Sequence, residues 1–112
     1  MRLNFLIRNC LQIFIFSCLP VFAVDFNSGK ELFNINCLAC HKNGQNVIIP
    51  EKNLKYETLE ENGMNNIDSI MYQIINGKNG MPAFGGRLKD LEIEEIAQYV
   101  LKESIVTNKK EF

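Results

Sequence analysis

Length and composition place this chain among small single-domain proteins. It has 112 residues, 46% hydrophobic side chains and a formal net charge of −1 at pH 7, which is enough for one domain. The slight acidic excess disfavours nucleic acid and anionic membrane surfaces as partners, because both attract basic proteins.

Residues 1–23 have the pattern of a cleaved secretory signal. Two arginines flank a short charged start, and Leu11 to Leu19 is almost entirely apolar. Val21-Phe22-Ala23 then occupies the positions that signal peptidase reads. The apolar run is much shorter than the ~20 residues that a membrane-spanning helix needs. We therefore expect residues 24–112 to form the mature domain, with no stable membrane insertion after the signal is removed.

Cleavage would leave a mature chain with few candidate metal ligands. Cys10 and Cys18 belong to the signal, so Cys37 and Cys40 are the only mature cysteines, and His41 is the only histidine in the sequence. This excludes a disulfide framework beyond one small loop, and it disfavours a zinc site, which needs about four ligands. The signal also carries two of the 12 basic residues, so 10 remain against 13 acidic ones and the formal charge becomes −3.

The mature chain begins with a predicted amphipathic helix. Ser28 and Glu31 match a capping box, which places the helix start at Asn27 or Ser28. Gly29 and Phe33 lie on its apolar face at helical spacing. A glycine inside a helix costs about 1 kcal/mol relative to alanine. A close helix crossing at Gly29 would explain that cost, and fraying near the N-cap is the alternative.

The stretch Cys37-Leu38-Ala39-Cys40-His41 is the attachment signature of c-type haem. On a helical turn the two thiols lie side by side, and each can add to one vinyl group of the porphyrin. The next residue then carries its imidazole under the iron. The histidine distinguishes this signature from a bare CxxC. We therefore predict that Cys37 and Cys40 bind haem covalently and that His41 is an axial iron ligand.

The competing interpretation from another functional class is a thiol oxidoreductase that uses the same two cysteines. It would require a thioredoxin-like sheet. No stretch of the sequence shows the alternation of apolar and polar residues that a strand of such a sheet would have.

Residues 42–50 form a predicted loop beneath the haem. Its end, Val47-Ile48-Ile49-Pro50, is too short and too closely bounded by proline to be a helix. A metal-bound histidine normally donates its second ring N–H to a carbonyl or carboxylate. We expect the acceptor to be a backbone carbonyl between Asn46 and Pro50; a plain surface loop is the alternative.

Two further helices follow. Leu54 to Glu61 should form a short one that Asn62-Gly63 stops. Asn65 or Asn66 should cap the next, which Asn76-Gly77 ends. Its polar residue Gln73 either approaches the haem or is a solvated helix residue. The apolar stripe of this helix follows helical spacing without a miss and consists of Ile67, Ile70, Met71, Ile74 and Ile75.

Residues 78–86 form a glycine-rich loop that contains Met81-Pro82. A methionine there has no helix face to fill. Because the sequence has no second histidine, and because a thioether is a common sixth ligand of haem iron in electron carriers, we predict Met81 as the second axial ligand. Met64 is the alternative.

Asp90 to about Glu103 is the last predicted helix, and Thr107 to Phe112 is predicted to be a polar tail. We expect the first and last helices to cross, with small Ala97 and its large neighbours receiving Gly29 and Phe33. The apolar stripe is Ile93, Ile96, Ala97 and Val100.

Several motifs of the mature chain resemble cytochrome c6, a family of soluble photosynthetic class I c-type cytochromes from algae and cyanobacteria. The similarity covers about Asp25 to Leu101. All c-type cytochromes share the haem signature, whereas the run from Met81 to Leu88 is far more specific. The matching segments are residues 37–41, 47–52, 62–65, 72–73, 76–78 and 81–88.

The resemblance implies an all-α class I cytochrome c fold, about four short helices wrapped around one covalently attached haem c, with His41 and Met81 as axial ligands. It implies a soluble one-electron carrier, not an enzyme, that serves the cytochrome b6f complex and photosystem I. The expected location is the thylakoid lumen of a chloroplast, or the lumen or periplasm of a cyanobacterium. We expect a monomer. The alternative is a periplasmic small cytochrome c that donates to a bacterial oxidase or reductase.

Overall fold

The computed structural model describes residues 26–110, and over that range the chain is helical. The predicted signal, residues 1–23, lies outside the described residues. Within them no strand forms, and the only extended pairing is an isolated bridge between Lys78 and Met81. The all-α prediction is confirmed. The elements are α2 (Phe26–Asn36), α3 (Leu38–His41), η2 (Lys42–Gly44), η3 (Pro50–Lys52), α4 (Tyr56–Glu61), α5 (Ile67–Asn76) and α6 (Asp90–Lys110), where η marks a 3-10 turn.

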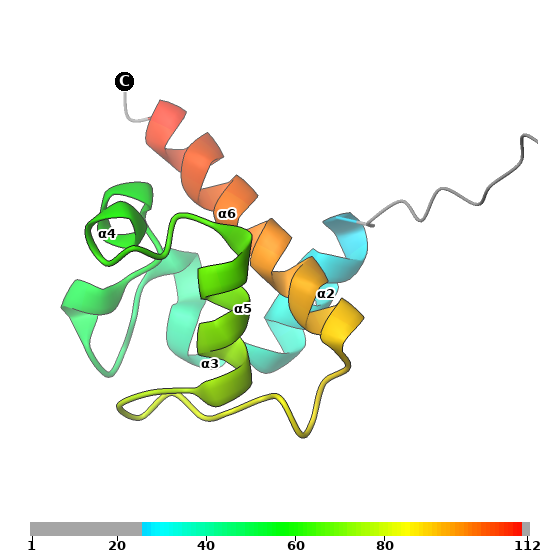
Figure 1. Ribbon diagram of the computed structural model, residues 1–112. Coiled ribbons are helices and arrows are strands. Elements are labelled where there is room, and N and C mark those ends of the chain that lie inside the picture. The colour runs from blue at the N-terminus through cyan, green and yellow to red at the C-terminus, as the bar shows by residue number, and fades with distance from the viewer. Residues whose placement is uncertain (1–25, 111–112) are drawn as a thin grey trace, which may run out of the picture.

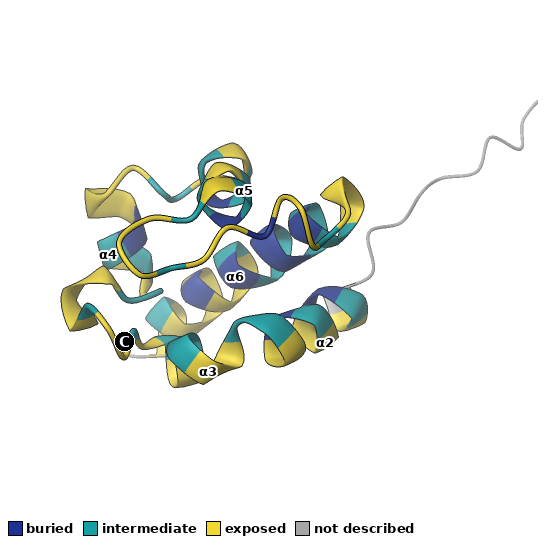
Figure 2. Cartoon of the chain, turned by 90° about the horizontal axis from the view of Figure 1, so that it is seen from below, coloured by how far each residue is buried: buried dark blue, intermediate teal, exposed yellow. Residues whose placement is uncertain are grey.

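Helix α6 is the element against which the others pack. Helix α2 crosses it on one side, and α5 and α4 lie on the other (Figure 1). Figure 2 shows the buried residues of α6 facing these neighbours, with the exposed residues of α2 and α3 turned outward. No helix between residues 26 and 110 has both the length and the apolar character needed to span a bilayer. The buried apolar stripe of α6 is the predicted one: Ile93, Ile96, Ala97 and Val100.

The predicted crossing of the first and last helices is confirmed at Gly29. A Cβ atom added there would overlap the carbonyl oxygen of Glu95 and lie 3.1 Å from Cβ of Tyr99. One turn later Phe33 is buried, and its ring centroid lies 5.3 Å from that of Tyr99 at a tilt of 55°. The atoms nearest to Gly29 therefore belong to the Glu95 backbone and to Tyr99, a large neighbour of Ala97, and not to Ala97 itself.

The start of α2 differs from its prediction. The helix already includes Phe26, so Ser28 lies inside its first turn and is not the N-cap. The Ser28 hydroxyl donates a 2.6 Å hydrogen bond to Oε2 of Glu95 on α6. The capping box with Glu31 was therefore wrong, because the close crossing offers the hydroxyl a carboxylate on another helix.

The end of α6 also differs, since the helix continues to Lys110 and includes the predicted polar tail as far as it is described. The hydroxyl of Thr107 donates a 2.8 Å hydrogen bond to the Glu103 carbonyl within the helix. Lys109 and Lys110 lie in the last turn, where positive charge is favourable against the helix dipole. The stretch is polar, but it lacks the glycine or proline that would end a helix.

Helices α4 and α5 follow their predictions closely. α4 begins at Tyr56, two residues later than expected. Asn66 caps α5, because its side chain accepts a 2.9 Å hydrogen bond from the Ser69 N–H. Gly77 ends α5 with a φ of 64°, and an added Cβ there would lie 2.7 Å from the carbonyl carbon of Pro82. Only glycine allows the chain to turn back this tightly toward the loop that contains Met81.

Candidate functional site

A cavity of about 440 Å³ lies between α2–α3, α5, α6 and the loops that join them. Its volume is within the usual range for small-molecule and cofactor sites. The four predicted haem-site residues, Cys37, Cys40, His41 and Met81, all line it. The apolar part of the wall comes from Phe33, Leu59, Ile70, Ile74, Phe84, Ile96 and Val100.

The α2–α3 junction places both cysteines and the histidine on one wall. Cys37 ends the hydrogen bonding of α2, with its N–H 2.8 Å from the Phe33 carbonyl. The carbonyl of Cys37 then accepts from the N–H groups of Cys40 at 3.2 Å and His41 at 3.0 Å. This tight turn brings together three side chains from the five consecutive residues 37–41, as the signature predicts.

Both cysteines are present as free thiols. Burial, and to a lesser extent the nearby charge of Cys40, together raise the pKa of the Cys37 thiol to about 11. At neutral pH Cys37 is therefore a protonated thiol. A redox-active CxxC needs the opposite, a thiol whose pKa is lowered so that thiolate forms. The thiol electrostatics and the lack of a sheet in residues 26–110 both disfavour a thiol oxidoreductase.

The imidazole of His41 is oriented by one backbone hydrogen bond. Its Nδ1 lies 2.9 Å from the carbonyl oxygen of Gln45. A carbonyl can only accept, so Nδ1 carries the proton and Nε2 has its lone pair free for a metal. We expected an acceptor between Asn46 and Pro50, which was wrong by one residue. The η2 turn, closed by a 3.1 Å bond from Gln45 N–H to Lys42 O, brings Gln45 back to the ring.

The loop after η2 folds onto the cavity through Asn46. The side-chain oxygen of Asn46 accepts from the N–H groups of Ile48 at 3.0 Å and Ile49 at 2.9 Å. Its amide nitrogen donates to the Lys52 carbonyl at 3.0 Å. Asn46, Ile48 and Ile49 all line the cavity. The predicted loop is thus part of the site and not a plain surface loop.

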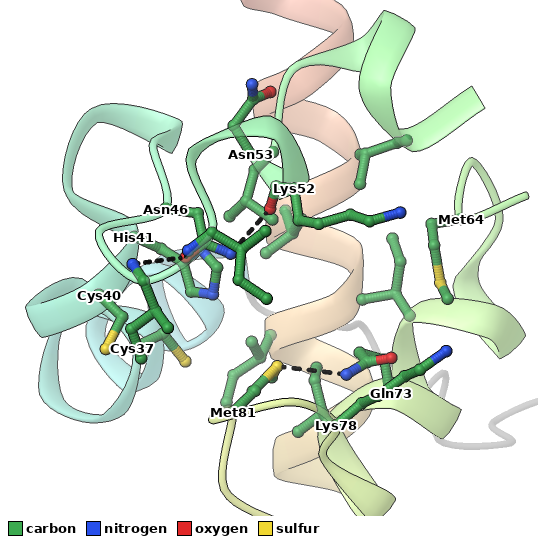
Figure 3. Close-up of a pocket in the computed structure, with 18 of the residues that line it drawn as sticks. Cys37, Cys40, His41, Asn46, Lys52, Asn53, Met64, Gln73, Lys78 and Met81 are labelled. Carbon is green, nitrogen blue, oxygen red and sulfur yellow. Dashed lines mark hydrogen bonds between the residues drawn. The ribbon is translucent and has the colours of Figure 1, made fainter. Parts of the chain in front are cut away.

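Met81 comes from the loop that follows α5. Its backbone pairs with that of Lys78 through two hydrogen bonds of 3.1 and 3.0 Å. Its sulfur accepts a hydrogen bond from Nε2 of Gln73 at 3.6 Å. Figure 3 shows Cys37, Cys40 and His41 on one side of the cavity, and Met81 with Gln73 on the side built from α5 and its loop. Met64 also lines the cavity.

The donor set of this cavity fits a c-type haem. Two thiols can form covalent bonds, an imidazole with a free Nε2 and a thioether are the iron ligands common in electron carriers, and the remaining wall is largely apolar, as a porphyrin requires. Met71, by contrast, packs against the core as predicted and does not line the cavity.

Comparison with known proteins identifies the family. Residues 24–100 match the family model described as "Cytochrome C oxidase, cbb3-type, subunit III". The chain is 59% identical to cytochrome c6 of Petalonia fascia over 72% of this chain and 95% of that protein. It is 50% identical to cytochrome c6 of Gracilaria tenuistipitata var. liui over 93% and 96% of the two chains. This chain belongs to the cytochrome c6 family.

Solved structures agree with this assignment. Cytochrome c6 from the diatom Phaeodactylum tricornutum has a TM-score of 0.71 and 50% identity, covering 73% of this chain and 97% of that one. The outer-membrane cytochrome OmcF from Geobacter sulfurreducens has a TM-score of 0.63 and 36% identity, over 66% and 95%. The class I cytochrome c fold is therefore confirmed. As a cytochrome c6 family member, the chain is an electron carrier with a covalently bound c-type haem, and not an enzyme.

Sequence reasoning missed the polar residues at the edge of the cavity. Lys52, Asn53, Asn62 and Lys78 line it together with residues of α4. The ammonium of Lys52 donates a hydrogen bond to the side-chain oxygen of Asn62. Two cations beside an apolar cavity suit the carboxylates of haem. No local sequence pattern could place Lys52 there, because its position depends on how the loop before α4 folds back.

Proposed function

We propose that this cytochrome c6 family member carries single electrons from the cytochrome b6f complex to photosystem I, with one haem per chain. This proposal rests on one observation: two thiols, an imidazole and a thioether line the same largely apolar cavity. In the proposal Cys37 and Cys40 form the thioether bonds, and His41 and Met81 are the axial ligands. When bound, the haem would supply a one-electron couple, and because His41 and Met81 would both hold the iron, no ligand position would be left for substrate or oxygen.

The choice of Met81 over Met64 is supported by how each thioether is placed. The backbone of Met81 is fixed by its two hydrogen bonds to Lys78, and its sulfur already has a polar contact with Gln73. Met64 lies at the opposite end of the cavity from Cys37 and Cys40 in Figure 3. A redox titration of the purified haem protein, followed by absorbance, tests haem content, ligation and potential together.

The proposed place of action is the thylakoid lumen of a chloroplast, or the lumen or periplasm of a cyanobacterium, with the protein acting as a monomer. The predicted signal over residues 1–23 supports export. Relatives named cytochrome c6 from Petalonia fascia, Porphyra purpurea and a Synechococcus strain support the photosynthetic assignment.

We propose that partners dock around the Met81 loop. Lys78, Arg87 and Lys89 are exposed beside it, in a protein whose mature charge is negative. The apolar part of this surface is Pro82, which is exposed. Phe84 does not contribute to this surface, because its side chain is only 7% exposed, and the Arg87 guanidinium lies 4.5 Å from its ring centroid. Complexes of this kind are small and transient, and charge sets their association rate.

Arg87→Glu should slow the reduction of photosystem I at low salt and weaken the salt dependence of that rate. The visible spectrum should stay intact. Lys30→Glu is the matched control. Lys30 is an exposed residue of α2, and its substitution makes the same charge change away from the Met81 loop. Laser-flash kinetics with isolated photosystem I measure the rate. Equal rates for the two variants would contradict the docking surface.

A second candidate partner is a bacterial terminal oxidase or reductase. The family model that matches residues 24–100 is described as an oxidase subunit, and the site chemistry is the same for both partners. Parallel assays with photosystem I and with oxidase-containing membranes distinguish the two partners. Faster turnover with the oxidase would make the oxidase, and not photosystem I, the preferred partner.

A further inference from the structure

The chain contains four Asn-Gly pairs, at residues 43–44, 62–63, 76–77 and 79–80. This dipeptide is chemically labile, because glycine has no side chain to hinder its backbone nitrogen from reaching the preceding carboxamide carbon. The reaction requires a carboxamide that can rotate and a glycine N–H that is not held elsewhere. Hydrogen bonding and exposure to water therefore decide together which of the four pairs is reactive.

Two of the pairs are held at both groups. The carboxamide of Asn62 donates a 2.7 Å hydrogen bond to the Thr58 carbonyl, and the next N–H, of Gly63, bonds Glu60 O at 3.0 Å. The pair at residues 76–77 is held in the same way, with 2.9 Å and 2.8 Å bonds to carbonyls of α5. Each carboxamide thus points back along its own helix, away from the glycine nitrogen.

The Asn79-Gly80 pair is held at neither group. Both residues are exposed, and among residues 26–110 neither the Asn79 side chain nor the Gly80 N–H has a hydrogen-bond partner. Their φ angles are +48° and +90°, and they are the two central residues of the turn closed by Lys78 and Met81. Asn-Gly is favoured in such a turn because both positions need positive φ.

The remaining pair, Asn43-Gly44, lies inside the η2 turn directly after His41. Asn43 and Gly44 also have positive φ angles, of 55° and 71°, and within residues 26–110 the Asn43 side chain has no hydrogen-bond partner either. This turn is closed by one hydrogen bond, from the Gln45 N–H to the Lys42 carbonyl. The difference from Asn79-Gly80 is exposure: Gly44 is half-buried, whereas Asn79 and Gly80 are both exposed to water. Asn43-Gly44 is therefore the closest internal competitor of Asn79-Gly80.

We propose that Asn79-Gly80 is a site of spontaneous deamidation, and that its product loosens the turn that positions Met81. The Gly80 nitrogen bonds to Cγ of Asn79, and the Cγ–Nδ2 bond breaks. Ammonia leaves with the proton from the Gly80 nitrogen, so that a cyclic imide remains. Water then adds to either imide carbonyl and opens the ring, giving aspartate or isoaspartate at residue 79.

The isoaspartate product changes the turn directly. It inserts one extra carbon into the main chain between residues 79 and 80. The residues on either side of them, Lys78 and Met81, are joined by backbone hydrogen bonds of 3.1 and 3.0 Å. It also places a carboxylate on the cavity wall that Asn79 lines. The deamidation stands independently of the haem, whereas its effect on ligation rests on the proposed role of Met81.

The test ages the purified haem protein in mild buffer and maps it by mass spectrometry. Trypsin releases residues 79–87, a peptide with a single asparagine. Digestion in ¹⁸O-labelled water marks any deamidation that occurs during the digest. We expect the amide-to-acid mass gain at Asn79 to appear several-fold faster than at Asn62 or Asn76. Asn79→Gln, which keeps a carboxamide but disfavours the five-membered ring, should abolish it. Faster conversion at Asn43, Asn62 or Asn76 overturns the proposal.

The second readout is the spectrum of the deamidated fraction, which contains the aspartyl and isoaspartyl products and which anion exchange separates from the parent protein through its added charge. We expect its ferric form to lose part of the sulfur-to-iron charge-transfer band of the fresh protein. A full band in that fraction overturns the loosening of the Met81 turn. A fresh protein without the band would instead contradict the proposed ligation, and the peptide map would still decide the deamidation.

Discussion

The two walls of the cavity are built in different ways. On the His41 wall, α2 packs tightly against α6 at Gly29, and the imidazole is oriented from a hydrogen-bonded turn by Gln45. On the Met81 wall, the ligand candidate belongs to a loop between α5 and α6, and three local hydrogen bonds hold it. Changes to the first wall should therefore alter folding, and changes to the second should alter redox properties.

The largest expected effect is on the first wall, from Cys37→Ala with Cys40→Ala. The domain is small, and a chain of 89 mature residues, 112 less the 23 of the signal, buries only a modest part of its surface. Bound haem would supply much of the core, and binding stabilises the folded state. We expect little helix by circular dichroism. A cooperative, well-folded apoprotein would contradict this.

Gly29→Ala tests the same wall without touching the cavity. The new Cβ overlaps the Glu95 carbonyl oxygen, and overpacking of this kind costs about 1–3 kcal/mol, against a gain in helix propensity of about 1 kcal/mol. We expect a net loss of stability in denaturant unfolding, with the reduction potential nearly unchanged. The matched control is Gly86→Ala, where an added Cβ meets no atom within 4 Å. Equal stability of the two variants would refute the close crossing.

On the second wall, Met81→His should keep the haem six-coordinate and lower its potential. Imidazole is a better donor than a thioether and stabilises ferric iron more. Axial identity helps to span roughly 0.8 V across haem proteins, so a drop on the order of 0.1 V is reasonable. Met64→Leu and Met71→Leu are the controls and should leave the potential nearly alone. If Met64→Leu removed the charge-transfer band, the assignment of Met81 would be wrong.

The periodic helices could be predicted because their signals are local. The stripes of α5 and α6 and the end of α5 at Gly77 were predicted correctly, and Asn66 is one of the two caps proposed for α5. The errors lie where a distant partner decides the structure. Ser28 looks like an N-cap until Glu95 is placed against it, and the polar end of α6 looks like a tail although it continues the helix to Lys110.

The candidate site divides in the same way. The Cys37–His41 signature places three side chains on a single turn, so the sequence predicts their proximity directly. Met81 was identified by elimination and by resemblance, since no periodicity links it to His41. The Gln45 carbonyl and the edge residues Lys52 and Asn62 depend on how the loops fold back, which no local pattern encodes.

Gln73→Leu is the mildest change on the Met81 wall, and it tests whether that wall tunes the potential without changing the ligand. The Gln73 N–H donates to the Met81 sulfur at 3.6 Å, and this donation draws electron density from the thioether. A weaker sulfur donor stabilises ferric iron less, so the contact raises the potential. Removing it should lower the potential by less than Met81→His does.

Leucine has a similar volume to glutamine, so the packing of α5 should change little and the unfolding free energy should stay close to that of the parent. Tyr72→Phe, on the neighbouring exposed position of α5, is the matched control and should leave the potential unchanged. Spectroelectrochemical titration of the three proteins in one buffer measures the difference. A potential that rises in Gln73→Leu would mean that removing a polar group beside the haem outweighs the hydrogen bond, and the tuning role of this contact would then be wrong.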